Sequence, residues 1–287
     1  MKTNFRTLKQ LALAAVTVLA SCEREDVAFN FGDAIIALEE VQETAAIDRI
    51  SDEVDNMAEN VYYTDEQDAL AGKPLGAMKT AETLYFLSEC VVITTVVTET
   101  SIEKTLDFGA GCETANGNML SGKIYLSYSK DMEADSNTIY TSFEDFYFNN
   151  ARVSGMRTVV RVRANANGNP QATVTFDIDV TWAGGLVTER QGTKVREWIE
   201  GVGNGDWTDN AYLITGNWTT AFWTGNVHQG EVITPLRREL SCLQLVSGVL
   251  RLQRNDRSGT LDYGDGSCDN EAVFTYDNGD VRIVGLN

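Results

Sequence analysis

Three carboxylates near the end of the chain are the residues best suited to bind a metal ion. Asp262, Asp265 and Asp269 surround a glycine-containing turn and offer the oxygen ligands that Ca²⁺ prefers. Their spacing is not that of an EF-hand, and an earlier, similar stretch keeps only Asp107 of the set. Asp and Gly are also the residues that a tight turn selects for its backbone. The group is a weak calcium candidate, and the sequence gives no other metal site.

Catalysis has little support in the residue pattern. Asp177 and Asp179 alternate in a predicted strand, so they share one face, where two carboxylates could hydrolyse a glycoside. The same alternation is typical of any solvated strand face. His228, the only histidine, lies in a loop-like stretch between Gly225 and Gly230 with no nucleophile motif beside it. We therefore expect no enzymatic activity and no cofactor.

The tryptophans gather in the middle of the chain. They are Trp182, Trp198, Trp207, Trp218 and Trp223. Flat indole rings stack on sugars and bind cationic ligands, but they also pack across neighbouring strands inside a sheet. The cluster marks residues 182–223 as the place to look for a ligand, and core packing is the alternative.

Two similar stretches indicate an internal repeat. TLDFGAGC spans residues 105–112 and TLDYGDGSC spans residues 260–268, and each follows an upstream cysteine. Each copy is then closed by a glycine and an alternating run, which begins at Gly122 in the first copy and at Gly279 in the second. We interpret this as one cysteine-bearing β unit used twice, at residues 87–128 and 240–287.

The cysteines of the two units fit disulfides. Cys90, Cys112, Cys242 and Cys268 allow three connectivities in an exported chain. If each copy is one structural unit, the repeat favours Cys90 with Cys112 and Cys242 with Cys268. A zinc site is the rival interpretation, but it would require CxxC spacing or several histidines.

Most of the chain has the period of β-strands. Val174, Phe176, Ile178 and Val180 alternate with polar residues, as in a strand with one buried face. Strands are expected near residues 90–98, 120–128, 137–148, 159–163, 174–180, 186–199, 210–215, 218–224, 231–234, 243–254 and 272–276. We predict a mainly β protein in which residues 80–287 form an antiparallel β-rich body, either an extended twisted sheet or a sandwich.

An N-terminal helical segment is expected over residues 31–72. Apolar residues three and four apart form a narrow stripe, and Gly72 and Pro74 mark its end. The stretch 64–67, Thr-Asp-Glu-Gln, fits the start of a short second helix. We expect the apolar stripe to pack on the sheet and the acidic face to lie in water.

The charge of the chain limits its partners. The 287 residues carry a formal net charge of −19, and residues 22–70 alone hold fifteen Asp or Glu against Arg24 and Arg49. Such a chain repels nucleic acid, which we do not expect as a partner.

The start of the chain predicts export and a lipid anchor. Residues 1–21 combine a basic head with a short apolar run, as in a secretory signal peptide, and residues 22–30 form an acidic tether. Leu19-Ala20-Ser21-Cys22 resembles the bacterial lipobox. The acidic residues behind Cys22 resemble the export tag of surface lipoproteins in the Bacteroidetes group, many of uncharacterised function. The resemblance implies a diacylglyceryl thioether and an acylated amino group on Cys22, and a surface-exposed outer-membrane location, with the inner leaflet as the alternative.

Together these patterns favour a non-catalytic binding or structural role at the cell envelope. The membrane contact would come through the lipid anchor on Cys22, and a glycan or an envelope protein would be the partner. One alternative is a glycan-binding accessory of a polysaccharide uptake system, which predicts a row of exposed Trp. The other is a carrier of lipid or another apolar ligand, which predicts a dry cavity inside a curved sheet.

Overall fold

The computed structural model of this chain describes residues 36–75 and 84–286. Within the chain, Ile35–Asn287 forms one compact unit that contains the helix and the strands. The predicted signal peptide, the acidic tether and the lipidated Cys22 lie outside the described residues.

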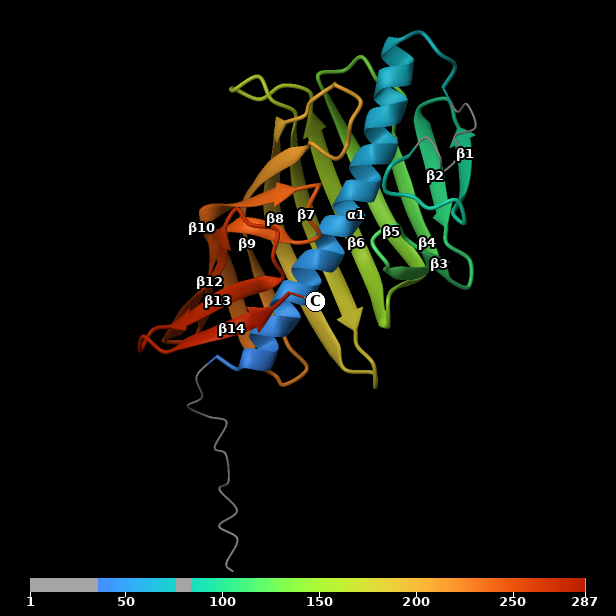
Figure 1. Cartoon of the computed structure of the whole chain (residues 1–287). Helices are drawn as coiled ribbons and strands as arrows, with labels where there is room; N and C mark the ends of the chain where they lie inside the picture. The colour runs from blue at the N-terminus through green and yellow to red at the C-terminus, as the bar shows by residue number, and fades with distance from the viewer. Residues whose placement is uncertain (1–35, 76–83, 287) are drawn as a thin grey trace, which may run out of the picture. The chain divides into compact units, whose positions relative to one another are not determined.

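The described residues form one helix and one antiparallel sheet (Figure 1). The helix is α1 (Leu38–Leu70). The strands are β1 (Val92–Val97), β2 (Ser101–Asp107), β3 (Cys112–Glu113), β4 (Met119–Ser129), β5 (Ser136–Phe148), β6 (Ala151–Val162), β7 (Gln171–Thr181), β8 (Val187–Glu200), β9 (Ala211–Ala221), β10 (Val227–Glu239), β11 (Leu245–Arg254), β12 (Arg257–Asp265), β13 (Glu271–Tyr276) and β14 (Val281–Gly285). Apart from the short β3, which pairs with β4, each strand pairs with its neighbours along the chain. The predicted mainly β, antiparallel class is confirmed, as an extended sheet.

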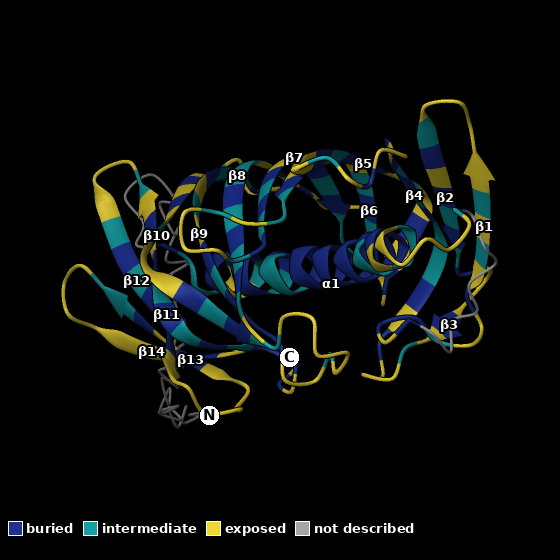
Figure 2. Ribbon diagram, turned by 90° about the horizontal axis from the view of Figure 1, so that it is seen from above, coloured by how far each residue is buried: buried dark blue, intermediate teal, exposed yellow. Residues whose placement is uncertain are grey.

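Alternation of apolar and polar residues builds the strands. On β7 the side chains of Val174, Phe176 and Ile178 are buried against the helix side, while Thr175 and Asp177 are exposed on the other face. Colour stripes along the strands in Figure 2 show the same alternation. We call the face turned away from α1 the outer face.

The two strands expected at 210–215 and 218–224 are one strand, β9. Gly216 lies at the predicted break with a φ of 144°, and a Cβ there would lie 2.3 Å from the carbonyl oxygen of Thr193. Glycine therefore lets the strand bend and continue in close contact with β8, rather than end.

The helix is continuous through the predicted second start. The hydroxyl of Thr64 donates a hydrogen bond to the carbonyl oxygen of Asn60 at 2.7 Å, within the helix, so it caps no new one. α1 ends at Leu70, just before Gly72 and Pro74, where the end was predicted.

The position of α1 contradicts the prediction of a solvated acidic face. The helix lies along the concave side of the sheet (Figure 1), and the sheet bends around it when seen from above (Figure 2). All residues from 51 to 62 are buried, and they include Asp52, Glu53, Asp55 and Glu59. The prediction failed because basic side chains of the sheet face these carboxylates.

The repeated stretches share local features near the two ends of the sheet. Leu106 and Leu261 are fully buried. Asp107 accepts a hydrogen bond from the Gly109 amide, as Asp262 does from the amide two residues on, at 2.8 and 2.9 Å. The two stretches therefore share a buried leucine and an aspartate–amide hydrogen bond, although β2 ends at Asp107 whereas β12 continues to Asp265.

The closing runs of the two copies do not correspond in space. In the first copy Leu106 lies opposite Ile124 on β4. In the second copy Leu261 lies opposite Phe274 on β13, whereas the run after Gly279 forms β14, one strand farther out. The two glycine-led runs therefore occupy different positions relative to the repeated strand.

Candidate functional site

One face of α1 is a stripe of acidic side chains. Asp48, Asp52, Asp55, Glu59 and Glu66 follow one another at steps of four, three, four and seven residues. These steps place the side chains on one side of an α-helix. The stripe faces the middle of the sheet, where strands β6, β8 and β10 carry arginine and lysine on the helix side.

Strand β8 shows how the two elements match. Arg190 pairs with Asp48, Lys194 donates to Ser51 at 3.0 Å, and Arg196 donates to Asn56 at 2.6 Å. The strand and the helix therefore run in the same direction. Arg190 and Lys194 are four residues apart, about 13 Å along a strand, and their partners Asp48 and Asp55 are seven residues apart, about 10 Å along a helix, so the two cations contact different turns of α1.

The densest group of charges lies halfway along α1, and we call it the central cluster. It consists of Asp48, Asp52, Asp55, Arg157, Arg190, Lys194, Arg196 and Arg238. Asp55 pairs with Arg157 and, at 2.7 Å, with Lys194. Asp52 pairs with Arg238 and, at 3.5 Å, with Arg196.

The surrounding cations control the ionisation of these carboxyls. Burial alone would raise the pKa of Asp52, but the charges of Arg238 and Arg196 outweigh it, and the pKa lies below its usual value. For the same reasons the pKa of Asp55 is lowered, with Arg157 as its strongest partner. Carboxylates held ionised in this way do not exchange protons near neutral pH, so the cluster is suited to hold structure rather than to transfer protons.

A second group, the upper cluster, lies at the C-terminal end of α1. It consists of Glu59, Asp65, Glu66, Lys104, Arg161 and Arg163. Arg161 pairs with Glu59 at 3.0 Å, Arg163 with Glu66 at 3.1 Å, and Lys104 with Asp65 at 2.9 Å. Its three carboxylates thus match its three cations.

His228 is buried beside the N-terminal end of α1. Its Nε2 lies 2.9 Å from Glu40, which also accepts hydrogen bonds from Thr224 and Asn226. Burial acts to raise the pKa of Glu40, but these hydrogen bonds lower it to about 2. The predicted loop-like position of His228 is therefore wrong: it lies on β10 and is 1% exposed.

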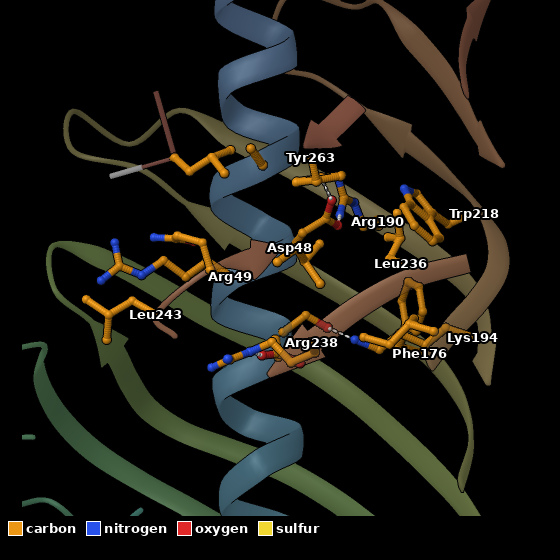
Figure 3. Close-up of a pocket in the computed structure, with 17 residues that line it drawn as sticks. Asp48, Arg49, Phe176, Arg190, Lys194, Trp218, Leu236, Arg238, Leu243 and Tyr263 are labelled. Carbon is orange, nitrogen blue, oxygen red and sulfur yellow. Dashed lines mark hydrogen bonds and ion pairs between the residues drawn. The ribbon is translucent and has the colours of Figure 1, made fainter. Parts of the chain in front are cut away.

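The interior contains a cavity of about 40 Å³ between α1 and the sheet (Figure 3). Asp48, Arg190, Lys194, Arg238 and Trp218 line it, together with apolar side chains such as Leu236. A cavity this small holds a few atoms and no lipid chain.

A much larger hollow, of about 830 Å³, lies on the outer face across strands β6–β11. Two adjacent rows of side chains border it. One row is Met156, Asp177, Gln191, Thr219, Gln229 and Gln253, and the other is Thr158, Thr175, Thr193, Asn217, Glu231 and Arg251. We call this hollow the outer groove. Amides and hydroxyls dominate it, and the exposed ring of Tyr140 lies beside its β6 end, opposite Thr158.

The predicted disulfides are confirmed. Cys90 bonds to Cys112 and Cys242 bonds to Cys268. Each bond closes the loop around one copy of the repeated stretch, at opposite ends of the sheet.

The five tryptophans do not form an exposed row. Trp198 and Trp218 are buried, Trp182 and Trp207 pack against the core, and Trp223 alone is largely exposed. Trp223 donates to Glu43 at 2.9 Å. This arrangement favours the core-packing alternative for most of the cluster.

The side chains of the weak calcium candidates form local hydrogen bonds with the backbone. Asp262, Asp265 and Asp269 each accept a hydrogen bond from the backbone amide two residues on. Within the described ranges no three His, Cys, Asp or Glu side chains are grouped so as to hold a metal ion. Asp177 and Asp179 share the outer face, as their alternation predicted.

The buried cations are the site residues that sequence reasoning missed. On β8 the helix-facing positions include Arg190, Lys194 and Arg196, while the outward positions include Glu189 and Gln191, so both faces of a central strand are polar. Such a strand contradicts the usual alternation. The basic inward face of β8 and the acidic stripe of α1 together could have indicated from the sequence that this strand and the helix pair.

The sequence matches no family model, and no curated protein or solved structure is detectably similar to it. Among the residues that the structure describes, no helix has both the length and the apolar character needed to cross a bilayer.

Proposed function

We propose that this chain is a non-catalytic lipoprotein of the outer-membrane surface that is anchored through Cys22 and binds a ligand or a partner on the outer face of its sheet. The lipobox-like residues 19–22 support the anchor. One observation carries the binding mode: α1 fills the concave side of the sheet and is held there by buried ion pairs, whereas the outer groove, of about 830 Å³, is open to a ligand.

The filled interior counts against the carrier alternative. A carrier needs a dry, apolar cavity of several hundred Å³. The cavity beside α1 has about 40 Å³ and is lined by Arg190, Lys194 and Asp52 among others. An apolar ligand would have to displace a helix that makes more than ten buried or partly buried polar contacts with the sheet, so internal carriage is disfavoured.

A glycan is the ligand class that the outer groove suits best. Its bordering side chains are mainly neutral amides and hydroxyls, which hydrogen-bond sugar hydroxyls, and Tyr140 offers an aromatic face at one end. The groove crosses six strands, so its length of roughly 24 Å suits a linear chain of several sugar units. Sugar binding would thus rest on polar rows, not on the tryptophans.

Two experiments test this proposal. Metabolic labelling with a fatty acid should label the wild-type chain but not Cys22→Ser, and a label that persists in the variant would refute the anchor. Binding to a panel of polysaccharides should give a ligand for the wild-type chain whose affinity falls at least tenfold in the double variant Gln191→Ala, Gln229→Ala.

Glu103→Gln provides the matched control for the groove variant. Glu103 is also exposed on the outer face but lies on β2, away from the groove. Equal affinity in the control and loss in the groove variant would support the site. If the wild-type chain bound no polysaccharide, or if the groove variant bound as well as the control, the glycan assignment would be wrong.

A further inference from the structure

The central cluster holds more positive than negative charge. It sets five cations, on β6, β8 and β10, against three carboxylates of α1. All five cations are buried, with exposures between 2% and 7%. Burial, together with the charges of Arg157 and Arg196, lowers the pKa of Lys194 despite the nearby Asp55.

The neighbouring groups do not supply the missing negative charge. The upper cluster is balanced, with three carboxylates and three cations. Glu53, the remaining buried carboxyl of this part of α1, accepts a hydrogen bond from Asn116, and burial and the charge of Asp52 raise its pKa although Arg238 and Arg49 lie near it. Counted over the described residues, the surplus of two positive charges is therefore local to the central cluster.

The surplus borders the cavity of about 40 Å³ (Figure 3). Its charged lining consists of Arg49, Arg190, Lys194, Arg238, Asp48 and Asp52. Trp218 also lines the cavity and is 6% exposed, and its indole N–H finds no acceptor among the described residues. The residues that line the cavity thus carry more positive than negative charge, and one of them has a buried donor without a partner.

We infer that a small monovalent anion of the halide class binds in this cavity. An anion supplies the acceptor that the indole N–H lacks and offsets the surplus charge, whereas a metal cation would be repelled. Roughly 10–15 Å³ of such volume admits one water, so a cavity of about 40 Å³ has room for one halide ion and little more. This inference does not depend on the proposed function.

The test compares chloride with gluconate, an organic anion too large for the cavity, at constant ionic strength. The full-length chain in non-ionic detergent should unfold about 5–10 °C higher once chloride reaches a hundred times its dissociation constant. The ³⁵Cl resonance should broaden in the presence of folded chain and sharpen when bromide competes. Water alone in the cavity predicts equal unfolding temperatures and no broadening, and that result would overturn the inference.

Three variants locate the site. Trp218→Phe keeps the ring but removes the donor, and Lys194→Met removes one surplus cation. Both variants should need at least ten times more chloride than the wild-type chain to reach the same rise in unfolding temperature. Lys123→Met removes an exposed cation on the outer face and should keep the wild-type response. If a cavity variant did not fold, the ³⁵Cl and unfolding measurements on the wild-type chain would still decide the inference, and an unchanged response in Trp218→Phe would place the anion elsewhere.

Discussion

The substitution Asp55→Asn tests whether the ion pairs between α1 and the sheet are shielded from water, as their burial in the structure indicates. Asp55 is 5% exposed and lies against Arg157, Lys194 and, at 3.9 Å, Arg196. Asparagine keeps the shape and some hydrogen bonds but removes the charge, which leaves three buried cations facing a neutral amide. Loss of one partner from a buried pair costs about 3–5 kcal/mol. Since domains unfold at a cost of about 5–15 kcal/mol, we expect a large fraction of the stability to disappear.

Urea denaturation followed by tryptophan fluorescence measures this loss, provided that the dependence on urea keeps its slope. The control is Glu144→Gln, because Glu144 pairs with Lys123 at 3.0 Å on the exposed outer face. That variant should lose little stability, because a solvent-exposed ion pair contributes little. Adding Lys194→Met to Asp55→Asn should recover part of the loss, since it removes one of the stranded cations. A loss for Asp55→Asn no larger than that of the control would refute the reasoning and mean that water reaches the cluster.

Three further predictions concern single features of the fold. Because the folded-state pKa of Glu40 lies at about 2 against 4.5 for the free group, its contribution is present above pH 4.5 and is lost as the pH falls towards 2. Urea titrations at pH 6 and pH 3 should show a loss of stability that is about 2 kcal/mol smaller in Glu40→Gln than in the wild-type chain. Replacing Cys242 and Cys268 by serine opens a loop of 26 residues and should lower the guanidinium midpoint by the equivalent of roughly 3.5 kcal/mol, whereas an unchanged midpoint would contradict the entropic estimate. Gly216→Ala should lower the unfolding temperature more than Gly168→Ala, because a Cβ at residue 216 meets the backbone of β8 whereas one at residue 168 meets nothing within 4 Å; equal shifts would show that strand β9 adapts.

The features that sequence alone predicted are those encoded within short stretches. The alternation of Val174, Phe176 and Ile178 defines β7 without reference to any other part of the chain. The disulfides followed from the repeat because each pair closes a loop within one copy, Cys90 with Cys112 in the first. Local patterns suffice where the partner residues are close in sequence.

The position of α1 could not be predicted in that way, since its partners are distant in sequence. Asp55 and Arg157 are 102 residues apart, and Asp52 and Arg238 are 186 apart. Rules for amphipathic helices assume an apolar core, so they assign a carboxylate stripe to water. The helix could have been predicted on the concave side of the sheet only by considering the acidic stripe of α1 together with the basic inward face of β8.

The middle of the acidic stripe leaves the register of α1 ambiguous. A slide of the helix by about one turn would bring Asp52 to the place of Asp48, and Asp55 to the place of Asp52, so several pairs with the sheet would survive. Arginines accept carboxylates from a range of directions, so the central cluster alone tolerates more than one alignment. The register must be fixed by contacts that do not repeat along the helix.

The N-terminal end of α1 provides one such contact. Glu40 pairs with His228, the only histidine of the chain. A slide by one turn in either direction would replace Glu40 with Ile36 or Thr44. Neither residue carries a charge, so the slipped helix would leave the imidazole buried without its carboxylate.

The other end of the helix gives an independent check on the same alignment. Asp65 accepts hydrogen bonds from Tyr128 at 2.7 Å and from Lys104 at 3.1 Å, and both donors are buried. A one-turn slide would place Val61 or Ala69 opposite Lys104 and leave its ammonium group buried and unpaired. Buried ion pairs often add little stability relative to an apolar core. A misaligned helix that leaves a buried charged group without its partner at each end of α1 would, however, lose much stability. The pairs at the two ends therefore select a single register for a helix whose central charges would accept several.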